Sequence, residues 1–279
     1  MSSPTDAPDA EATASDAVEP APAASGPAAA IARYLPGRRE ALFMLGGTVL
    51  GGTFAGGAWG ASAMGADSGA HAAVAERDDE EKLSSKEALK RLAAGNERFV
   101  HGTAAHPDQT VSRRRALREG QHPFAAILTC ADSRVSPELV FDQGLGDLFV
   151  VRSAGQVLDH AVLGSLQYGV AELGTPLLVV LGHSKCGAVK ATIEAIEKKS
   201  KPSGTDIDAL VSAIRPSVEE AEELGATEKN ILSISIDMNV ERIVEQLKAA
   251  PVLAAAAKTR KVKIVGATYD IATGEVEWL

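Results

Sequence analysis

The sequence predicts an α/β fold with a mostly parallel central sheet flanked by helices. Short, almost continuously apolar runs alternate with longer helical patterns, which is typical of parallel strands covered on both faces. A turn signal, Thr273-Gly274, separates the last two apolar runs and predicts an antiparallel edge strand at the C-terminus. A helical pattern ahead of the first strand predicts an N-terminal helical arm.

The individual elements follow from periodicity and capping signals. Apolar residues recur on one face over 86–100, which predicts a helix, and Asp159 is placed to cap another helix that runs to about residue 173. Further helices are expected over 111–118, 186–199, 206–224 and 228–249. Strands are expected over 124–129, 148–152, 176–181, 262–268 and 275–279.

Composition narrows the class of protein. The chain has 279 residues, a net charge of −9 and 2 cysteines. The acidic balance argues against a nucleic-acid partner, which requires a basic face. Two cysteines exclude a scaffold that depends on several disulfides. A soluble enzyme or binding domain remains as the bulk of the chain.

The first 75 residues differ from the rest. Residues 1–37 are a low-complexity segment that we expect to be disordered, because it has few large apolar side chains to bury. Residues 38–75 resemble a twin-arginine export signal: Arg38 and Arg39 precede the uncharged stretch 41–66 and small residues that suit cleavage. The alternative is a membrane anchor, since 26 uncharged residues can span a bilayer. We expect the body, residues 76–279, to be exported to the periplasm or the extracellular space, or held at the membrane through 41–66.

Both cysteines follow predicted strands. Cys130 follows the first strand, and His183 and Cys186 follow the third. Sites in parallel sheets form at the carboxyl ends of strands, so these side chains should converge there. Two thiolates and an imidazole, with a fourth position open, match a catalytic zinc centre. A disulfide, a pair of buried thiols and a structural histidine are the alternatives.

A carboxylate and a guanidinium lie two residues apart beside the first cysteine. Paired with Arg134, Asp132 would stay ionised and fixed in orientation. Beside a metal ion it could accept a hydrogen bond from water and direct that water's lone pair. An ordinary salt bridge is the alternative.

The segments Cys130-Ala-Asp-Ser-Arg134 and His183-Ser-Lys-Cys-Gly187 resemble the two signatures of the β-class carbonic anhydrases. The similarity covers about residues 84–279. It includes the stretches Gly95–Phe99, Phe141–Arg152 and Gly266–Asp270. The resemblance implies one Zn²⁺ per subunit, held by Cys130, His183 and Cys186, with Asp132 and Arg134 as the catalytic pair.

The resemblance also implies residues that contact substrate. Gln121 falls at the position of a substrate-contacting glutamine, and Phe149 and Tyr168 would line an apolar pocket. Gly187 is expected among the same residues because a glycine directly after Cys186 lets the backbone approach closely. The family builds its sites at a dimer interface, which implies a homodimer or a dimer of dimers with the helical arm wrapped around the partner. One departure is the segment Ser153–Gln156, where Asn-Ala-Gly-Asn is more usual.

The expected function is therefore the zinc-dependent reversible hydration of carbon dioxide to bicarbonate and a proton. The first alternative is a hydrolase of another small heteroallene, such as carbon disulfide, on the same zinc scaffold. The second is a metal-free exported binding domain with a Cys130–Cys186 disulfide. The sequence leaves open which group removes the proton and whether Asp132 can swing onto the metal.

Overall fold

The computed structural model describes residues 83–259 and 261–279. The predicted segments 1–37 and 38–75, including the stretch 41–66, lie outside these residues and stay predictions. Within the described ranges, none of the helices combines the length and the apolar character that a membrane span needs.

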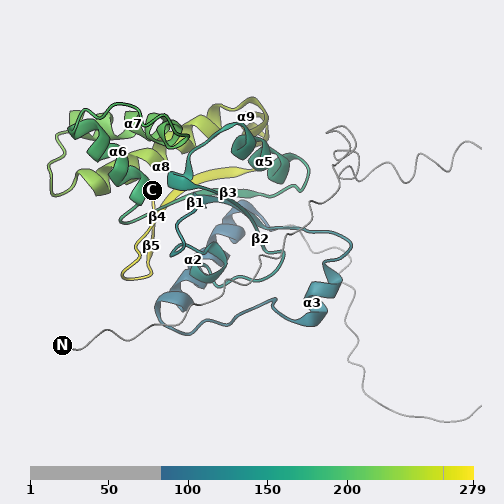
Figure 1. Cartoon of the computed structure of the whole chain (residues 1–279). Coiled ribbons are helices and arrows are strands. Elements are labelled where there is room, and N and C mark those ends of the chain that lie inside the picture. The colour runs from purple at the N-terminus through teal and green to yellow at the C-terminus, as the bar shows by residue number, and fades with distance from the viewer. Residues whose placement is uncertain (1–82, 260) are drawn as a thin grey trace, which may run out of the picture. The chain divides into compact units, whose positions relative to one another are not determined.

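Five strands form one sheet in the order β2-β1-β3-β4-β5 (Figure 1). Strands β1, β2, β3 and β4 pair in parallel, and β4 pairs with β5 in antiparallel fashion. This confirms the predicted fold class. The strands are β1 (Ala125–Cys130), β2 (Leu148–Ser153), β3 (Leu177–His183), β4 (Lys263–Tyr269) and β5 (Val276–Trp278).

The helices confirm most of the sequence prediction. They are α2 (Ser85–Val100), α3 (Val111–Ala116), α4 (Pro137–Val140), α5 (His160–Ala171), α6 (Gly187–Glu197), α7 (Ile207–Glu223), α8 (Ile231–Ala249) and α9 (Pro251–Lys258), with a 3₁₀ turn, η1, at Ala154–Gln156. Asp159 caps α5 as expected, accepting a hydrogen bond from Val162 N–H at 2.7 Å. Helices α4 and α9 are not among the predicted helices. Both begin with a proline, which resembles a stop signal but is also favoured in the first turn of a helix.

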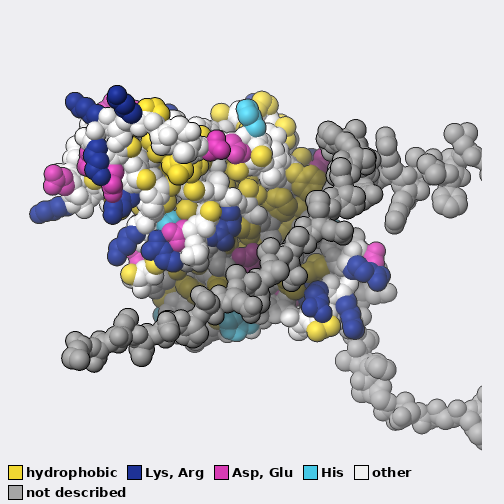
Figure 2. Space-filling model, viewed as in Figure 1, with side chains coloured by type: hydrophobic (Ala, Val, Ile, Leu, Met, Phe, Trp, Pro, Cys, Tyr) yellow, Lys and Arg dark blue, Asp and Glu magenta, His cyan; other side chains and the backbone are white. Residues whose placement is uncertain are grey.

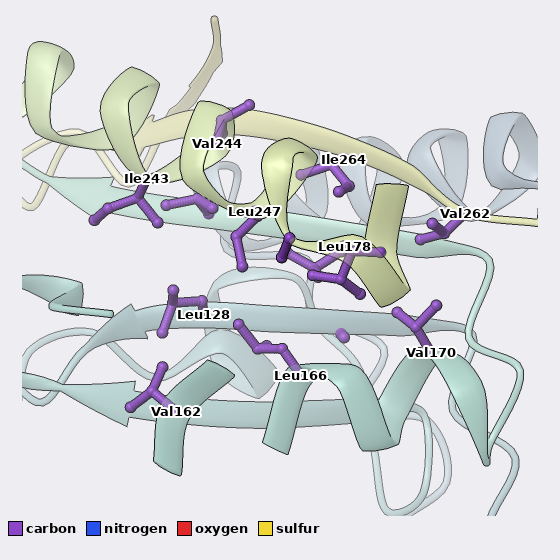
Figure 3. Close-up of a cluster of buried hydrophobic side chains, with 14 of the residues drawn as sticks. Leu128, Val162, Leu166, Val170, Leu178, Ile243, Val244, Leu247, Val262 and Ile264 are labelled. Atoms are coloured by element: carbon purple, nitrogen blue, oxygen red, sulfur yellow. The ribbon is translucent and has the colours of Figure 1, made fainter. Parts of the chain in front are cut away.

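The central strands are apolar on both faces, and each face packs against a separate hydrophobic core. In β1 and β3, even-numbered residues such as Leu128 and Leu178 pack with α5, α8 and α9 (Figure 3). Odd-numbered neighbours such as Ile127 and Val179 pack with α2 on the opposite face. This alternation follows from the two-residue period of a strand. A third, smaller cluster joins α6, α7 and α8 to Cys130 and Cys186, so the two cysteines lie where helices cover the strand ends.

Basic and acidic side chains are interspersed over the visible face (Figure 2). Arginines gather locally over α3.

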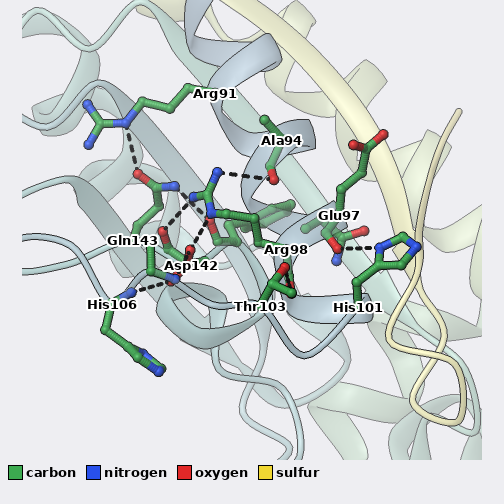
Figure 4. Close-up of polar contacts among 12 residues, drawn as sticks. Arg91, Ala94, Glu97, Arg98, His101, Thr103, His106, Asp142 and Gln143 are labelled. Carbon is green, nitrogen blue, oxygen red and sulfur yellow. Dashed lines mark hydrogen bonds and ion pairs between the residues drawn. The ribbon is translucent and has the colours of Figure 1, made fainter.

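The arm helix α2 is anchored by a buried carboxylate. Asp142 accepts hydrogen bonds from the guanidinium of Arg98 and from the backbone N–H groups of Ala105 and His106 (Figure 4). Its side chain is almost fully buried, whereas Arg98 is about one-third exposed. Burial opposes ionisation of Asp142, but the hydrogen bonds from Ala105, Arg98 and His106 hold its pKa below the usual range.

We expect Asp142→Asn to lower the free energy of unfolding by about 3 kcal/mol at pH 7, because Arg98 loses its buried partner. A carboxyl with a lowered folded pKa contributes stability above its unfolded pKa of about 3.9 and loses it as the pH falls. The difference between wild type and Asp142→Asn should therefore shrink between about pH 5 and pH 3. Urea unfolding at several pH values measures this, with the exposed Glu241→Gln as control. A constant difference across that range would contradict the prediction.

Candidate metal centre

The candidate site lies where the chain reverses its direction of winding. From β1 the sheet continues to β2 on one side and to β3 on the other. In such sheets a crevice opens at the carboxyl ends of the two strands that flank the switch. Cys130 is the last residue of β1, His183 is the last residue of β3, and Cys186 caps the N-terminus of α6. The predicted convergence follows from this topology.

The ligand atoms of Cys130, His183 and Cys186 all lie within 4.8 Å of one another, and all three residues are buried. Both cysteines are free thiols. The ring of His183 is oriented by its Nδ1, which lies 2.9 Å from the carbonyl oxygen of Ser184. Its Nε2 is buried and has no hydrogen-bond partner among the described residues. A ring nitrogen left free beside two sulfurs fits a zinc ligand, since metal-bound histidines usually donate through the other nitrogen.

The two sulfurs differ in acidity. A hydrogen bond from the Cys186 thiol lowers the pKa of Cys130 to about 4, helped by backbone donors that include Asp132 and Gly155. The Gly155 N–H donates to the Cys130 sulfur at 3.2 Å. The pKa of Cys186 is raised because this thiol keeps the shared proton and is buried. A divalent cation that binds both sulfurs would displace that proton.

The Asp132 carboxylate is held by its neighbour two residues along. Arg134 donates from its backbone N–H, from Nε and from Nη2 to Asp132, at 3.0, 2.9 and 2.7 Å. These bonds hold the pKa of Asp132 well below its usual range. Arg134 Nη2 also lies 3.4 Å from the carbonyl oxygen of Lys185, which ties the pair to the loop between His183 and Cys186. In this arrangement the carboxylate engages the guanidinium and stands outside the cluster of metal-ligating atoms.

Arg152 is a residue that sequence reasoning missed as part of the site. It is the penultimate residue of β2, and its Nε and Nη2 donate to the carbonyl oxygens of Cys130 and Asp132 at 3.0 and 2.7 Å. These two hydrogen bonds fix the backbone that carries the candidate ligand Cys130 and the Asp132 carboxylate. Its position could have indicated this role. Arg152 is a charged residue near the carboxyl end of an apolar strand, and functional sites form at that edge of a parallel sheet.

The predicted substrate-contacting residues lie elsewhere in the chain. Phe149 pairs with Ala126, four residues before Cys130, which places it about 13 Å along the strand from the cluster. Its ring contacts that of Tyr168, with centroids 6.3 Å apart, and Tyr168 is 47% exposed. Gln121 is exposed and precedes β1. One copy of the chain therefore does not bring these three side chains to the cluster, and their assignment to the pocket stays a prediction.

Gly187 and the departure at Ser153–Gln156 can also be placed. Gly187 begins α6, and a β-carbon there would meet no atom of the described chain within 4 Å, so no contact within the chain requires its predicted role in close approach. Ser153 Oγ donates to the carbonyl of Val157 at 2.7 Å. Gln156 is buried beside Gly155, with a positive φ of 46°. These observations concern contacts within the chain, so the predicted effect of this segment on substrate access stays a prediction.

Comparison with known proteins agrees with this geometry. The family described as carbonic anhydrase matches residues 125–276. The carbonic anhydrase of Mycolicibacterium smegmatis is 45% identical over 193 residues, which cover 68% of this chain and 91% of that protein. This chain belongs to the β-class carbonic anhydrases. Carbonic anhydrase 2 of Mycobacterium tuberculosis is 55% identical over 131 residues, 47% of this chain and 63% of its own length.

Solved β-carbonic anhydrases share the fold. Two tetrameric β-carbonic anhydrases from Sordaria macrospora are represented by a structure that matches with a TM-score of 0.55 and 23% identity, over 69% of this chain and 97% of that one. The Coccomyxa β-carbonic anhydrase in complex with acetazolamide matches with a TM-score of 0.52 and 25% identity, over 70% of this chain and 82% of that one. The enzyme class predicted from the two cysteine segments is confirmed by the family match and by the 45% identical relative.

Proposed function

We propose that this β-carbonic anhydrase catalyses the zinc-dependent reversible hydration of carbon dioxide to bicarbonate and a proton. The observation that carries the proposal is the buried cluster of Cys130, His183 and Cys186, with the free His183 Nε2 beside two sulfurs. One Zn²⁺ per subunit, held by these three residues, would supply Lewis acidity and lower the pKa of a water molecule toward neutrality.

The protein side chains would orient the reaction. Asp132, kept ionised by Arg134, can accept a hydrogen bond from the attacking water and direct its lone pair toward carbon dioxide. Arg152 fixes the backbone on both sides of that position. Arg134 has to hold Asp132 throughout, because a released carboxylate would be free to compete for the metal.

Removal of the metal tests this function. We expect purified protein to contain about one zinc per chain, to lose carbon dioxide hydration on dialysis against a strong chelator, and to recover it when Zn²⁺ is added. Carbon disulfide hydrolysis is assayed in parallel, and a thiol count reports whether Cys130 and Cys186 are reduced. Zinc-free protein with full activity, or a disulfide-bonded active form, would contradict the proposal.

We propose further that a homodimer, alone or within a dimer of dimers, completes the site. Strand β2 pairs only with β1 among the described strands, and its apolar residues 148–151 are only partly buried. A second copy packed here could bring Gln121, Phe149 and Tyr168 to the partner's cluster. The Sordaria macrospora enzymes are described as tetrameric. Light scattering should give a dimer or tetramer, and an active monomer would refute this arrangement.

We propose export of the protein on the basis of residues 38–75 alone. The pair Arg38-Arg39 and the uncharged stretch 41–66 support passage out of the cytoplasm, with either cleavage or retention at the membrane. Fractionation of cells that express the full chain should place the protein outside the cytoplasm. Recovery in the cytoplasm alone would refute export.

A further inference from the structure

The turn between β2 and α5 is hydrogen-bonded both to the Cys130 sulfur and to helix α8, and the mechanism above uses neither contact. Gly155 has a positive φ of 64°, and a β-carbon there would lie 2.7 Å from Ile214 Cδ1. The turn therefore needs glycine both for its backbone conformation and for its packing. This same residue donates its N–H to the Cys130 sulfur.

The carbonyl of Gly155 is held from the other side by α8. Asn239 Nδ2 donates to it at 3.0 Å, and Asn239 is only 2% exposed. The Asn239 Oδ1 accepts a longer hydrogen bond, 3.4 Å, from Ser217 Oγ of α7. A continuous chain of contacts therefore runs from α7 through Asn239 and Gly155 to a candidate metal ligand.

We propose that Asn239 is a positioning residue for the metal centre: it fixes Gly155 so that the Gly155 N–H stays directed at the Cys130 sulfur. The inference rests on the proposed zinc site. Glycine is the least restrained of residues, so an unanchored turn could rotate this N–H away. A hydrogen bond to a thiolate withdraws part of the negative charge that the sulfur would otherwise donate to the metal. This matters in a site with two sulfurs, because their donated charge weakens the Lewis acidity of the ion.

The test replaces Asn239 with Leu, which has similar volume and no donor. In the full chain we expect the affinity for Zn²⁺, measured by competition with a chromophoric chelator, to fall by about 10-fold or more, within the range known for outer contacts of metal ligands. In the Co²⁺-substituted protein, the near-ultraviolet sulfur-to-cobalt absorption should shift. Asn239→Asp is the second variant, because it keeps the size and can still accept from Ser217 but places an oxygen against the Gly155 carbonyl.

Ser217→Ala is the matched control. It removes the other contact of Asn239 at an equally buried position and leaves the bond to Gly155. It should lower the melting temperature while zinc affinity and the cobalt spectrum stay at wild-type values. If both Asn239 variants lower only the melting temperature, as Ser217→Ala does, Asn239 is purely structural and the inference is wrong. A wild-type chain that binds neither Zn²⁺ nor Co²⁺ would instead overturn the proposed function, and this inference with it.

Discussion

Cys186→Ser is expected to lose most of its zinc and to reduce carbon dioxide hydration by at least about 100-fold, more than the loss of an outer contact would cost. Cys186 is at once a candidate ligand and the N-cap of α6. Serine is a favoured N-cap, so the substitution should leave α6 intact or stabilise it. It removes only the soft thiolate that zinc prefers. The variant thus separates a metal-binding role from a structural one.

Zinc content by mass spectrometry, activity and circular dichroism are the measurements. Lys190→Ala is the control, because its side chain is 68% exposed on the same helix. It should keep zinc and activity. A Cys186→Ser protein with full zinc and near-normal hydration would show that the thiolate is dispensable.

Asp132→Asn should lower the rate of hydration by about 10² to 10⁴, the usual contribution of a positioned proton-accepting group, while zinc content stays at wild-type level. Asparagine has nearly the same shape and keeps one oxygen for Arg134. It replaces the second carboxylate oxygen, now bonded to Arg134 Nη2, with a donor that would repel the guanidinium. The variant therefore loses both the charge and the fixed orientation.

Activity and zinc content measured on the same preparation decide the result. Glu194→Gln removes an exposed carboxylate paired with Lys198 on α6 and should change neither quantity. Near-normal hydration by Asp132→Asn with full zinc would refute the assigned role. Loss of zinc together with activity would show that Asp132 supports the metal site itself.

Several features of the site could be predicted because they are local in sequence. In the segment Cys130-x-Asp132-x-Arg134, the two charged residues are close enough in sequence to form an ion pair. In His183-x-x-Cys186, one candidate ligand ends β3 and the other precedes α6. The apolar runs predicted which segments are strands, with bounds within two residues of the structure.

Other features depend on segments that are distant in sequence. Arg152 reaches the carbonyls of Cys130 and Asp132 only because β2 lies beside β1 in register. Asn239 meets Gly155 across 84 positions of the chain. The position of Arg152 near the end of an apolar strand becomes informative only once β2 is known to lie beside β1. Asn239 carries no local pattern that separates it from an ordinary buried helical asparagine.

The sequence by itself determined the fold class, the enzyme family and the identity of the candidate ligands, because strand periodicity and short motifs are local properties of the chain. Only the tertiary structure decided that Arg152 and Gly155 support the Cys130 segment, and that Phe149 lies about 13 Å along the strand from the cluster of its own chain. The physical reason is that hydrogen bonds and packing act between neighbours in space, and strand order and register decide which residues become neighbours.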